Sequence, residues 1–346
     1  MVNIKNIRKA LIISLIAILT TGIVLFGTGC TNKEPVTKEG YYLDTICQIT
    51  IYNMKDMSEK NAEKAIEGAF DTCEKYENML SKTRKESDIY KINHGNSQPV
   101  KCNEETIEVI KKGIHYGEIS DGLFDITVGK ETDLWNFHDE KPKVPDEKEL
   151  QDAVTHVGYE KIHIDGDRVW LDDSEAEIDL GGIAKGYISD RVAEYLEKNG
   201  VESAIINLGG NISVVGYKDK DKTPFKIGIK KPFDKEGKIL GTVELDNGTI
   251  VTSGIYERCF KENGKLYHHI LNPENGYPVN SGIEAVTIEG GKGKSCDCDA
   301  MATICLLMGE EKGKKFIESQ KGYEALFVDD NGKITMTKGM KSFKPE

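Results

Sequence analysis

The chain has 346 residues, of which 38% are hydrophobic and 30% are charged, so it can bury a substantial core and is not a wholly disordered protein. Its formal net charge is −12, and removing residues 1–29, with three basic and no acidic residues, leaves 43 basic against 58 acidic residues, a net charge of −15. A chain this acidic does not bind nucleic acid through a general phosphate field, and a phosphate ester ligand would need a compensating cation or helix end.

The N-terminal segment has the pattern of a bacterial export signal. Three basic residues precede an uncharged, mostly apolar run over residues 10–26, and small residues then lead to Cys30. This arrangement resembles a lipoprotein box, so we expect a signal peptide over residues 1–29 and a lipid anchor such as palmitate at Cys30. A retained N-terminal anchor and free secretion are the alternatives, and all three place the globular part outside the cytoplasm. Lipid attachment predicts a protein on the extracytoplasmic face of the cell membrane.

The rest of the chain is predicted to be a tether followed by one folded domain. We expect residues 30–40 to be a lipid-anchored polar tether and residues 41–346 to form the domain. Apart from Cys30, the chain has seven cysteines without regular spacing. An exported protein could oxidise them, but the odd number and the scatter favour free thiols over a disulfide framework.

Hydrophobic periodicity predicts a mixture of strands and helices along the domain. We expect a strand over 42–52, helices over 58–80 and 104–116, a hairpin over 161–171 and a strand over 177–180. A helix over 185–199, a strand over 203–208, hairpin turns at Asn247-Gly248, Asn263-Gly264 and Asn331-Gly332, and a helix over 297–308 follow. Because several strands are connected by hairpins, the pattern favours an α+β fold over a doubly wound parallel sheet.

A glycine turn at residues 179–186 (D-L-G-G-I-A-K-G) stands between a predicted strand and a predicted helix. This order of elements brings backbone amides and a helix N-terminus to a phosphate, and Lys185 would add a positive charge. The spacing is not that of the nucleotide-binding P-loop. A glycine turn needed only for packing remains the alternative.

Asp299 and Thr303 are four residues apart on the last predicted helix, so they project from one helical face. A carboxylate and a hydroxyl are oxygen ligands suited to Mg²⁺, whereas the alternative is an ordinary solvated face. The Cys296-Asp297-Cys298 run does not predict a zinc site, because no second Cys or His pair accompanies it at the required spacing.

Two further segments carry candidate side chains. His268 and His269 are adjacent and point in opposite directions on a strand, so at most one can face a site and move protons, and a structural histidine is the alternative. Residues 121–128 predict a turn into a strand, with Phe124 available to cover an aromatic ring or to fill the core. After the turn at residues 252–258, Arg258 could hold a phosphate or form a surface ion pair.

Taken together, these motifs are more specific than any one of them. The set D-G-x-F-D-x-T-V, D-L-G-G-I-A-K-G-Y, N-L-G-G-N, S-G-x-Y-E-R, H-H-I-L-N-P and D-A-M-A-T resembles the ApbE family of FAD:protein FMN transferases over residues 42–328. The resemblance implies a single compact α+β unit of T-fold-like architecture with FAD bound in a cleft. It also implies Mg²⁺, with FAD as substrate and FMN ester-linked through its phosphate to a Thr or Ser hydroxyl of a target protein while AMP leaves.

The resemblance also assigns roles to residues of this chain. It implies His269 as the group that assists deprotonation of the acceptor hydroxyl. The metal would be bound by Gly182, Asp299 and Thr303. The FAD site would include Leu43, Thr83, Leu123, Phe124, Asp125, Asp179, Lys185 and Ile270, although the family often has a methionine where this chain has Leu43 and an aromatic residue where it has Thr83.

The family's acceptors are typically subunits of Rnf- or Nqr-type membrane redox complexes, which the resemblance implies as partners. Two other functions fit the same residues. One is a Mg²⁺-dependent FAD pyrophosphatase that gives FMN and AMP, and the other is a non-catalytic FAD-binding lipoprotein.

Overall fold

The computed structural model describes residues 34–52 and 57–346, and the predicted signal peptide and Cys30 lie outside these ranges. The described residues form one compact unit. Within the described ranges no helix is both long enough and apolar enough to span a bilayer. The seven cysteines of this part of the chain are all unpaired, in line with the scattered spacing of these residues in the sequence.

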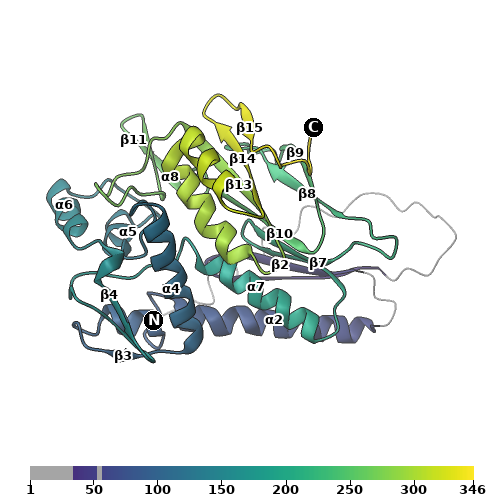
Figure 1. Ribbon diagram of the computed structural model, residues 1–346, viewed down its shortest axis with the longest axis horizontal. Coiled ribbons are helices and arrows are strands. Elements are labelled where there is room, and N and C mark those ends of the chain that lie inside the picture. Colours follow the sequence, from purple (N-terminus) through teal and green to yellow (C-terminus); the bar gives the residue numbers. More distant parts are fainter. Residues whose placement is uncertain (1–33, 53–56) are drawn as a thin grey trace. The chain divides into compact units, whose positions relative to one another are not determined.

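The centre of the unit is an eight-stranded antiparallel sheet (Figure 1). Neighbouring strands along it are antiparallel throughout, which fits the hairpin signals in the sequence. In spatial order the strands are β1 (Val36–Tyr42), β2 (Thr45–Ile51), β6 (Ser203–Leu208), β7 (Asn211–Gly216), β10 (Gly248–Gly254), β13 (Ile283–Gly291), β14 (Tyr323–Asp329) and β15 (Ile334–Met336).

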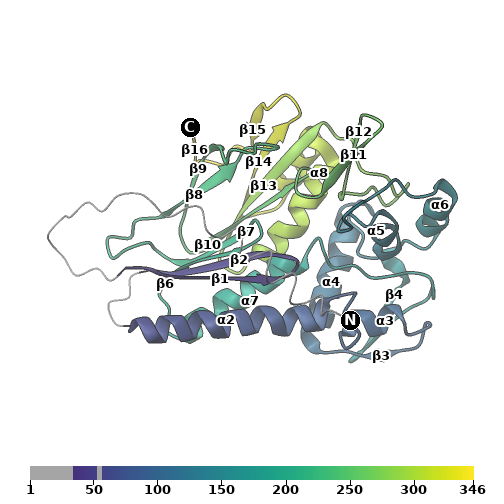
Figure 2. The ribbon, with the colours of Figure 1, turned by 180° about the vertical axis from the view of Figure 1, so that it is seen from behind.

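Three long helices cover one face of this sheet: α2 (Glu59–Leu80), α7 (Ala184–Lys198) and α8 (Ser295–Ser319). The side chain of Ser58 caps α2 by accepting from the N–H of Asn61, and apolar residues at helical spacing along α2 are buried against the sheet. Figure 2 shows α2 running along β1 and β2. The last helix carries a kink at Gly309, where φ is 76°, so its first part ends where the sequence places the end of the predicted helix.

A second, smaller sheet packs on the opposite face of the large sheet. It consists of β16 (Phe343–Pro345), β9 (Ile239–Leu245) and β8 (Phe225–Lys230). Every second side chain of β8, starting at Phe225, is buried, so this strand alternates between a second apolar core and solvent.

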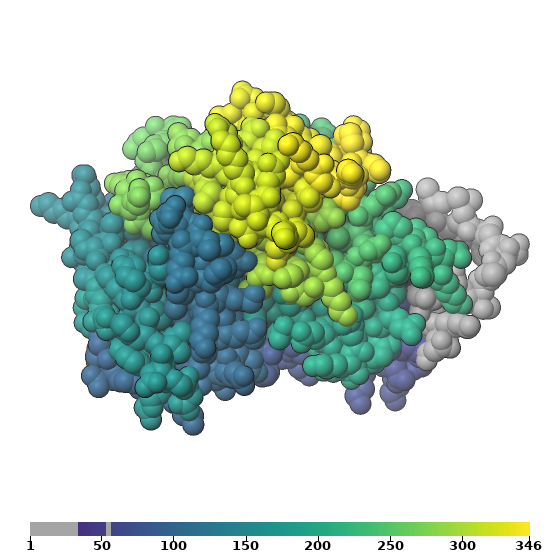
Figure 3. Space-filling view, viewed as in Figure 1, coloured from purple at the N-terminus to yellow at the C-terminus, as the bar shows by residue number. Residues whose placement is uncertain are grey.

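The segment between α2 and α7 forms a helical region with its own small sheet. This region has α3 (Asp88–Asn93), α4 (Glu104–Ile119), α5 (Gly129–Trp135), α6 (Glu147–Thr155) and a single 3₁₀ turn at Tyr159–Lys161, with the sheet β3 (Val100–Lys101), β5 (Arg168–Leu171) and β4 (Ile162–Asp165). Lys112 of α4 forms an ion pair with Asp297 of α8 at 2.6 Å, and Figure 3 shows the two helices side by side. The short hairpin β11 (Cys259–Glu262) and β12 (Lys265–His268) follows β10.

The mixed architecture confirms the predicted α+β class, and the four predicted helices, the strand over 203–208 and the hairpin over 161–171 are present. Three details of the prediction are wrong. The chain is already in strand β1 from Val36, so residues 36–40 belong to the sheet and not to a tether. The predicted strand over 42–52 contains the turn between β1 and β2. Asn247-Gly248 connects strands of two different sheets and is not the turn of a hairpin.

The strand predicted over Glu177–Leu180 is also wrong, because only Glu177 forms a bridge, to Val128, and a side chain takes the other edge of the segment. Asn93 donates to the carbonyl oxygen of Ile178 at 2.9 Å and accepts from its N–H at 2.8 Å, taking the place of a neighbouring strand. Likewise, residues 124–128 form turns that lead into α5 and not a strand, because the Asp125 carboxylate accepts from the N–H of Thr127.

Candidate active site

The glycine turn and the last helix, far apart in the sequence, meet directly. The N–H of Gly186 donates to Oδ2 of Asp299 at 2.9 Å. A Cβ at position 186 would lie 2.2 Å from the carbonyl oxygen of Ser295 and 2.8 Å from Cβ of Asp299, so only glycine permits this approach. The turn and the helix are therefore one structural unit, as the phosphate-binding interpretation requires.

Asp299 is a buried carboxylate whose charge is only partly compensated. Its residue is 2% exposed, and burial raises its pKa although Lys185, the Gly186 N–H and the Asn211 amide oppose the shift. Lys185 Nζ lies 3.8 Å from Oδ1, too far for a hydrogen bond. Nδ2 of Asn211 is buried and meets no acceptor in hydrogen-bond geometry among the described residues. A cation beside Asp299 would compensate the charge of its carboxylate.

The other two predicted metal ligands lie next to Asp299. Thr303 follows one helical turn later and is partly exposed in an otherwise buried stretch of α8. A Cβ built at Gly182 would lie 3.8 Å from Oγ1 of Thr303, so the turn passes over this hydroxyl. A carboxylate, a hydroxyl and a backbone carbonyl are a donor set that suits Mg²⁺ with water or substrate completing its shell. Across residues 34–52 and 57–346 no three His, Cys, Asp or Glu side chains converge as a metal cluster.

Asp179 fixes the entrance of the glycine turn. Its Oδ1 accepts from the N–H of Gly181 at 2.8 Å, and its Oδ2 accepts from Thr132 Oγ1 at 2.8 Å and pairs with Lys82 Nζ at 3.2 Å. Burial disfavours the charged form, but Lys82 and these hydrogen bonds outweigh it and lower the pKa of Asp179. Lys82 also donates to the carbonyl oxygen of Gly129 at 2.9 Å, so it connects the end of α2 to α5.

The predicted residues of the 121–128 segment lie beside the glycine turn. The ring of Phe124 is 5% exposed, and its Cε2 would be 3.0 Å from a Cβ at Gly182. Leu123 is partly buried against the main core. Asp125 is 8% exposed, and its oxygens accept from Thr127 and from the N–H of Tyr159 at 2.8 Å. The carboxylate therefore shapes the loop that carries Phe124.

The two histidines have different environments. His268 is 4% exposed, its Nε2 donates to the carbonyl oxygen of Val279 at 2.9 Å, and burial lowers its pKa to about 4. Nδ1 of His269 points to the carbonyl oxygen of Arg258 at 3.3 Å, which leaves Nε2 as the unprotonated nitrogen. Burial first, then Arg258 and Lys185, lower the pKa of His269 to about 3. Of the two histidines, only His269 keeps a ring nitrogen, Nε2, without a hydrogen-bond partner among the described residues. The adjacent Ile270 is buried in the core.

Lys185 lies between the glycine turn and the carboxylate of Glu257, a residue that the sequence motifs did not suggest. Its Nζ is 3.4 Å from the carbonyl oxygen of Gly181. Its positive charge opposes the rise in the pKa of Asp299 and Glu257 and contributes to the lowered pKa of His269. Glu257 is exposed to solvent, and a Cβ at Gly210 would lie 3.6 Å from its Oε1. Sequence reasoning used the Y-E-R motif only for Arg258.

Leu43 and Thr83, the two predicted FAD residues farthest from the others in sequence, both lie near the C-terminal end of α2. The N–H of Leu43 donates to Glu77 at 3.2 Å, and Thr83 is exposed beside Ser81. The exposed His138 lies between Leu43, Thr83 and the other site residues. The charges of Asp44, Asp179, Lys82 and Arg258 all influence its pKa. These two residues are thus on the Asp179 side of the site.

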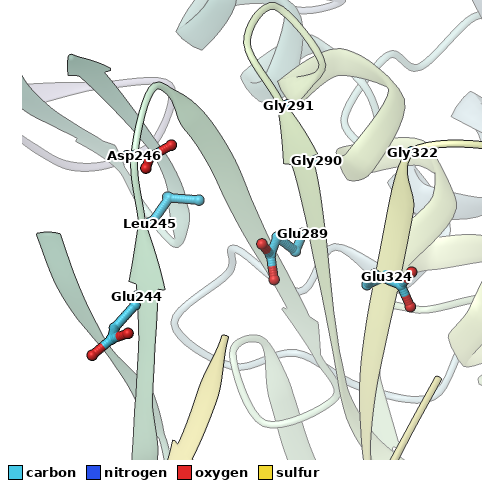
Figure 4. Close-up of a pocket in the computed structure, with 8 residues that line it drawn as sticks. All are labelled: Glu244, Leu245, Asp246, Glu289, Gly290, Gly291, Gly322 and Glu324. Atoms are coloured by element: carbon cyan, nitrogen blue, oxygen red, sulfur yellow. The ribbon is translucent and has the colours of Figure 1, made fainter. Parts of the chain in front are cut away.

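A separate hollow of about 210 Å³ does not coincide with these residues. Figure 4 shows it between β9, β13 and β14, with four carboxylates around it. Burial and the neighbouring carboxylates Glu324 and Asp246 raise the pKa of Glu289. This acidic surface would repel a pyrophosphate. The lining residues are Glu244, Leu245, Asp246, Glu289, Gly290, Gly291, Gly322 and Glu324.

Comparisons with known proteins show the family of this chain. The sequence model of the ApbE family matches residues 43–327. The chain is 33% identical to an FAD:protein FMN transferase of Klebsiella pneumoniae, over 78% of this chain and 83% of the relative, and 29% identical to one of Treponema pallidum, over 92% of each. The ApbE protein of Thermotoga maritima has a similar structure (TM-score 0.81, 30% identity, 90% of this chain and 100% of that one). So does the flavin transferase ApbE of Vibrio cholerae (TM-score 0.79, 28% identity, 90% and 99%).

Proposed function

Because this chain belongs to the ApbE family and is an enzyme of the FAD:protein FMN transferase type, we propose that it uses Mg²⁺ to transfer FMN from FAD to a protein hydroxyl. The product would be a phosphoester between FMN and a Thr or Ser of the acceptor, and AMP would leave. We place Mg²⁺ at Gly182, Asp299 and Thr303 and the FAD pyrophosphate at the turn of residues 181–186.

One observation carries this proposal, which is the contact between the glycine turn and Asp299. The Gly186 N–H to Asp299 hydrogen bond of 2.9 Å holds a buried, incompletely compensated carboxylate under a turn whose backbone can approach a phosphate. The oxygen donors of Asp299 and Thr303 lie on the same face of α8, one helical turn apart. Bound Mg²⁺ would neutralise pyrophosphate charge there and so favour attack at phosphorus.

The chain's own residues then have separate tasks. Lys185 adds positive charge beside the turn, and Asp179 holds the Gly181 N–H in place. His269 accepts the proton of the acceptor hydroxyl at Nε2, the nitrogen that its contact with Arg258 leaves unprotonated. The acceptor oxygen forms a bond to the FMN phosphorus, the bond from that phosphorus to the bridging oxygen breaks, and AMP departs with that oxygen.

The position of the protein in the cell is part of the same proposal. We assign the lipid anchor to Cys30 and the domain to the extracytoplasmic face of the membrane, on the basis of the export signal and lipoprotein box in the sequence. The acceptors would be subunits of Rnf- or Nqr-type complexes, whose membrane location matches an anchored enzyme.

An assay with FAD, Mg²⁺ and a purified acceptor domain of an Rnf-type subunit distinguishes the possible activities. The proposal predicts a covalent fluorescent flavoprotein and one AMP per label. AMP without labelling would indicate a pyrophosphatase, and FAD binding without either product would indicate a storage protein; both results would contradict the transfer.

A further inference from the structure

The turn end of the β1–β2 hairpin carries exposed apolar side chains. Tyr41 and Ile46 are 63% and 65% exposed, and they lie directly opposite each other in the register of β1 and β2. Large apolar side chains on a strand pair normally face a core, and an exposed cross-strand pair indicates a contact surface.

Both side chains point away from α2. Tyr42, the neighbour of Tyr41, stacks on Phe70 of α2 with ring centroids 5.2 Å apart, and Cys47, the neighbour of Ile46, is buried in the same core. Since side chains alternate along a strand, Tyr41 and Ile46 lie on the opposite face. Figure 2 shows α2 on one side of β1 and β2 and the β8–β9 hairpin on the other.

The turns at the ends of β2, β6 and β10 lead from this pair towards the candidate active site. Cys47 of β2 is opposite Leu208 of β6, so Ile46 is next to the Gly209-Gly210 turn, and adjacent strands are about 4.8 Å apart. Gly210 in turn approaches Glu257, and the charges of Lys185 and Asp299 both influence the pKa of the Glu257 carboxylate. The path from Ile46 to Glu257 therefore spans roughly two strand spacings, about 10 Å.

A second exposed aromatic residue stands at the other end of this path. Phe233, in the β8–β9 loop, is 43% exposed and packs edge-on against Tyr256, with ring centroids 5.9 Å apart. Tyr256 directly precedes Glu257. Three of the four large apolar residues exposed in the described part of the chain thus lie on this face, and the fourth, Met336, is on β15 at the opposite edge of the sheet.

We propose that Tyr41, Ile46, Phe233 and Tyr256 form a docking strip for the acceptor protein, which would bring its hydroxyl-bearing segment to the site beside Glu257. This assignment rests on the proposed transfer. A protein substrate needs a contact surface beside the site, whereas a small molecule such as FAD would not. A partner with exposed apolar side chains fits the strip. An anionic lipid surface fits it less well, because a chain with net charge −15 outside residues 1–29 would be repelled.

The test is a kinetic comparison of the full-length chain with the double variant Tyr41→Thr and Ile46→Thr. Threonine is itself β-branched and favours a strand, and it removes most of the apolar contact of both side chains. With an acceptor domain of an Rnf-type subunit as substrate, KM for the acceptor should rise about 10-fold or more, while kcat and the Kd for FAD stay unchanged. Met336→Thr is the matched control and should leave KM for the acceptor at the wild-type value.

The outcomes separate the docking strip from the function it rests on. Normal labelling by the double variant, with an unchanged KM for the acceptor, would rule out the docking strip but not the transfer. If the double variant binds phosphatidylcholine vesicles less well than the wild type but has an unchanged KM for the acceptor, the strip would be assigned to the membrane instead. A wild-type enzyme that splits FAD but never labels the acceptor would rule out both the transfer and the docking strip.

Discussion

At the scale of single residues, two adjacent histidines illustrate how position decides chemistry. His268 uses both ring nitrogens for contacts within the protein, whereas His269 uses only Nδ1, towards the carbonyl oxygen of Arg258. The sequence could predict that at most one of them faces the site, because strand side chains alternate. Each ring also contacts a carbonyl oxygen 11 residues away, which no local pattern predicts, and the second contact of His268 is the N–H of Ile270.

His269→Ala should therefore slow transfer far more than it weakens FAD binding. Loss of a general base typically costs about 10² to 10⁴ in rate, while the pyrophosphate contacts at the turn stay intact. The labelling rate and the Kd for FAD, measured on the same preparation, check this. His163→Ala, in the exposed hairpin of β4 and β5, is the control and should label at the wild-type rate. A His269→Ala enzyme with a normal rate would contradict the assigned role.

Glu131 gives a prediction about pH and stability. It is 0% exposed, neither carboxylate oxygen has a hydrogen-bond partner within the described residues, and burial and then Asp125 raise its pKa from 4.5 to about 8. The folded state therefore binds this proton more tightly than the unfolded state does. Its contribution to stability is fully present below pH 4.5 and is lost as the pH rises to about 8.

Glu131→Leu removes that dependence and fills the same space. At pH 8 the variant should be more stable than the wild type by roughly 2–4 kcal/mol, and the difference should shrink towards pH 5. Urea unfolding at both pH values measures it. A variant that is less stable at pH 8 would show that Glu131 has a partner that favours its charged form.

At the scale of elements, the contact between α7 and α8 depends on glycine. A Cβ at Gly186 would overlap the Ser295 carbonyl oxygen, so Gly186→Ala should push the two helices apart and cost roughly 2–4 kcal/mol. Thermal unfolding and a Mg²⁺ titration monitored by calorimetry should both show the loss. Gly291→Ala is the matched control, because a Cβ there meets nothing within 4 Å. Equal stability of the two variants would contradict the close approach.

The elements with strong periodicity could be predicted from the sequence, and the others could not. Helix α2 has a capping serine and a continuous apolar stripe, so its bounds follow from the chain alone. The extended segment at residues 177–180 looks like a strand because its side chains alternate, but it forms a single bridge, from Glu177 to Val128, and Asn93 takes both backbone groups of Ile178. No local pattern shows that a distant side chain will replace a neighbouring strand.

At the scale of the whole molecule, the candidate site joins segments that are distant in the chain. Motif order led to Gly182, Asp299 and Thr303 through a family resemblance, and the fold brings these three residues together. Lys82 and Glu257 were missed because each is a single charged residue without periodic context. Their positions follow only from the three-dimensional arrangement of α2, α5 and the turn after β10.

The most direct measurement of the central claim is the anomalous signal of Mn²⁺, substituted for Mg²⁺, in crystals grown with FAD. The account predicts one Mn²⁺ peak within coordination distance, about 2.0–2.3 Å, of Asp299, Thr303 and the Gly182 carbonyl oxygen, with the FAD pyrophosphate against residues 181–186. In Asp299→Asn crystals that peak should disappear. A Mn²⁺ peak elsewhere, with the pyrophosphate remote from the glycine turn, would contradict the account.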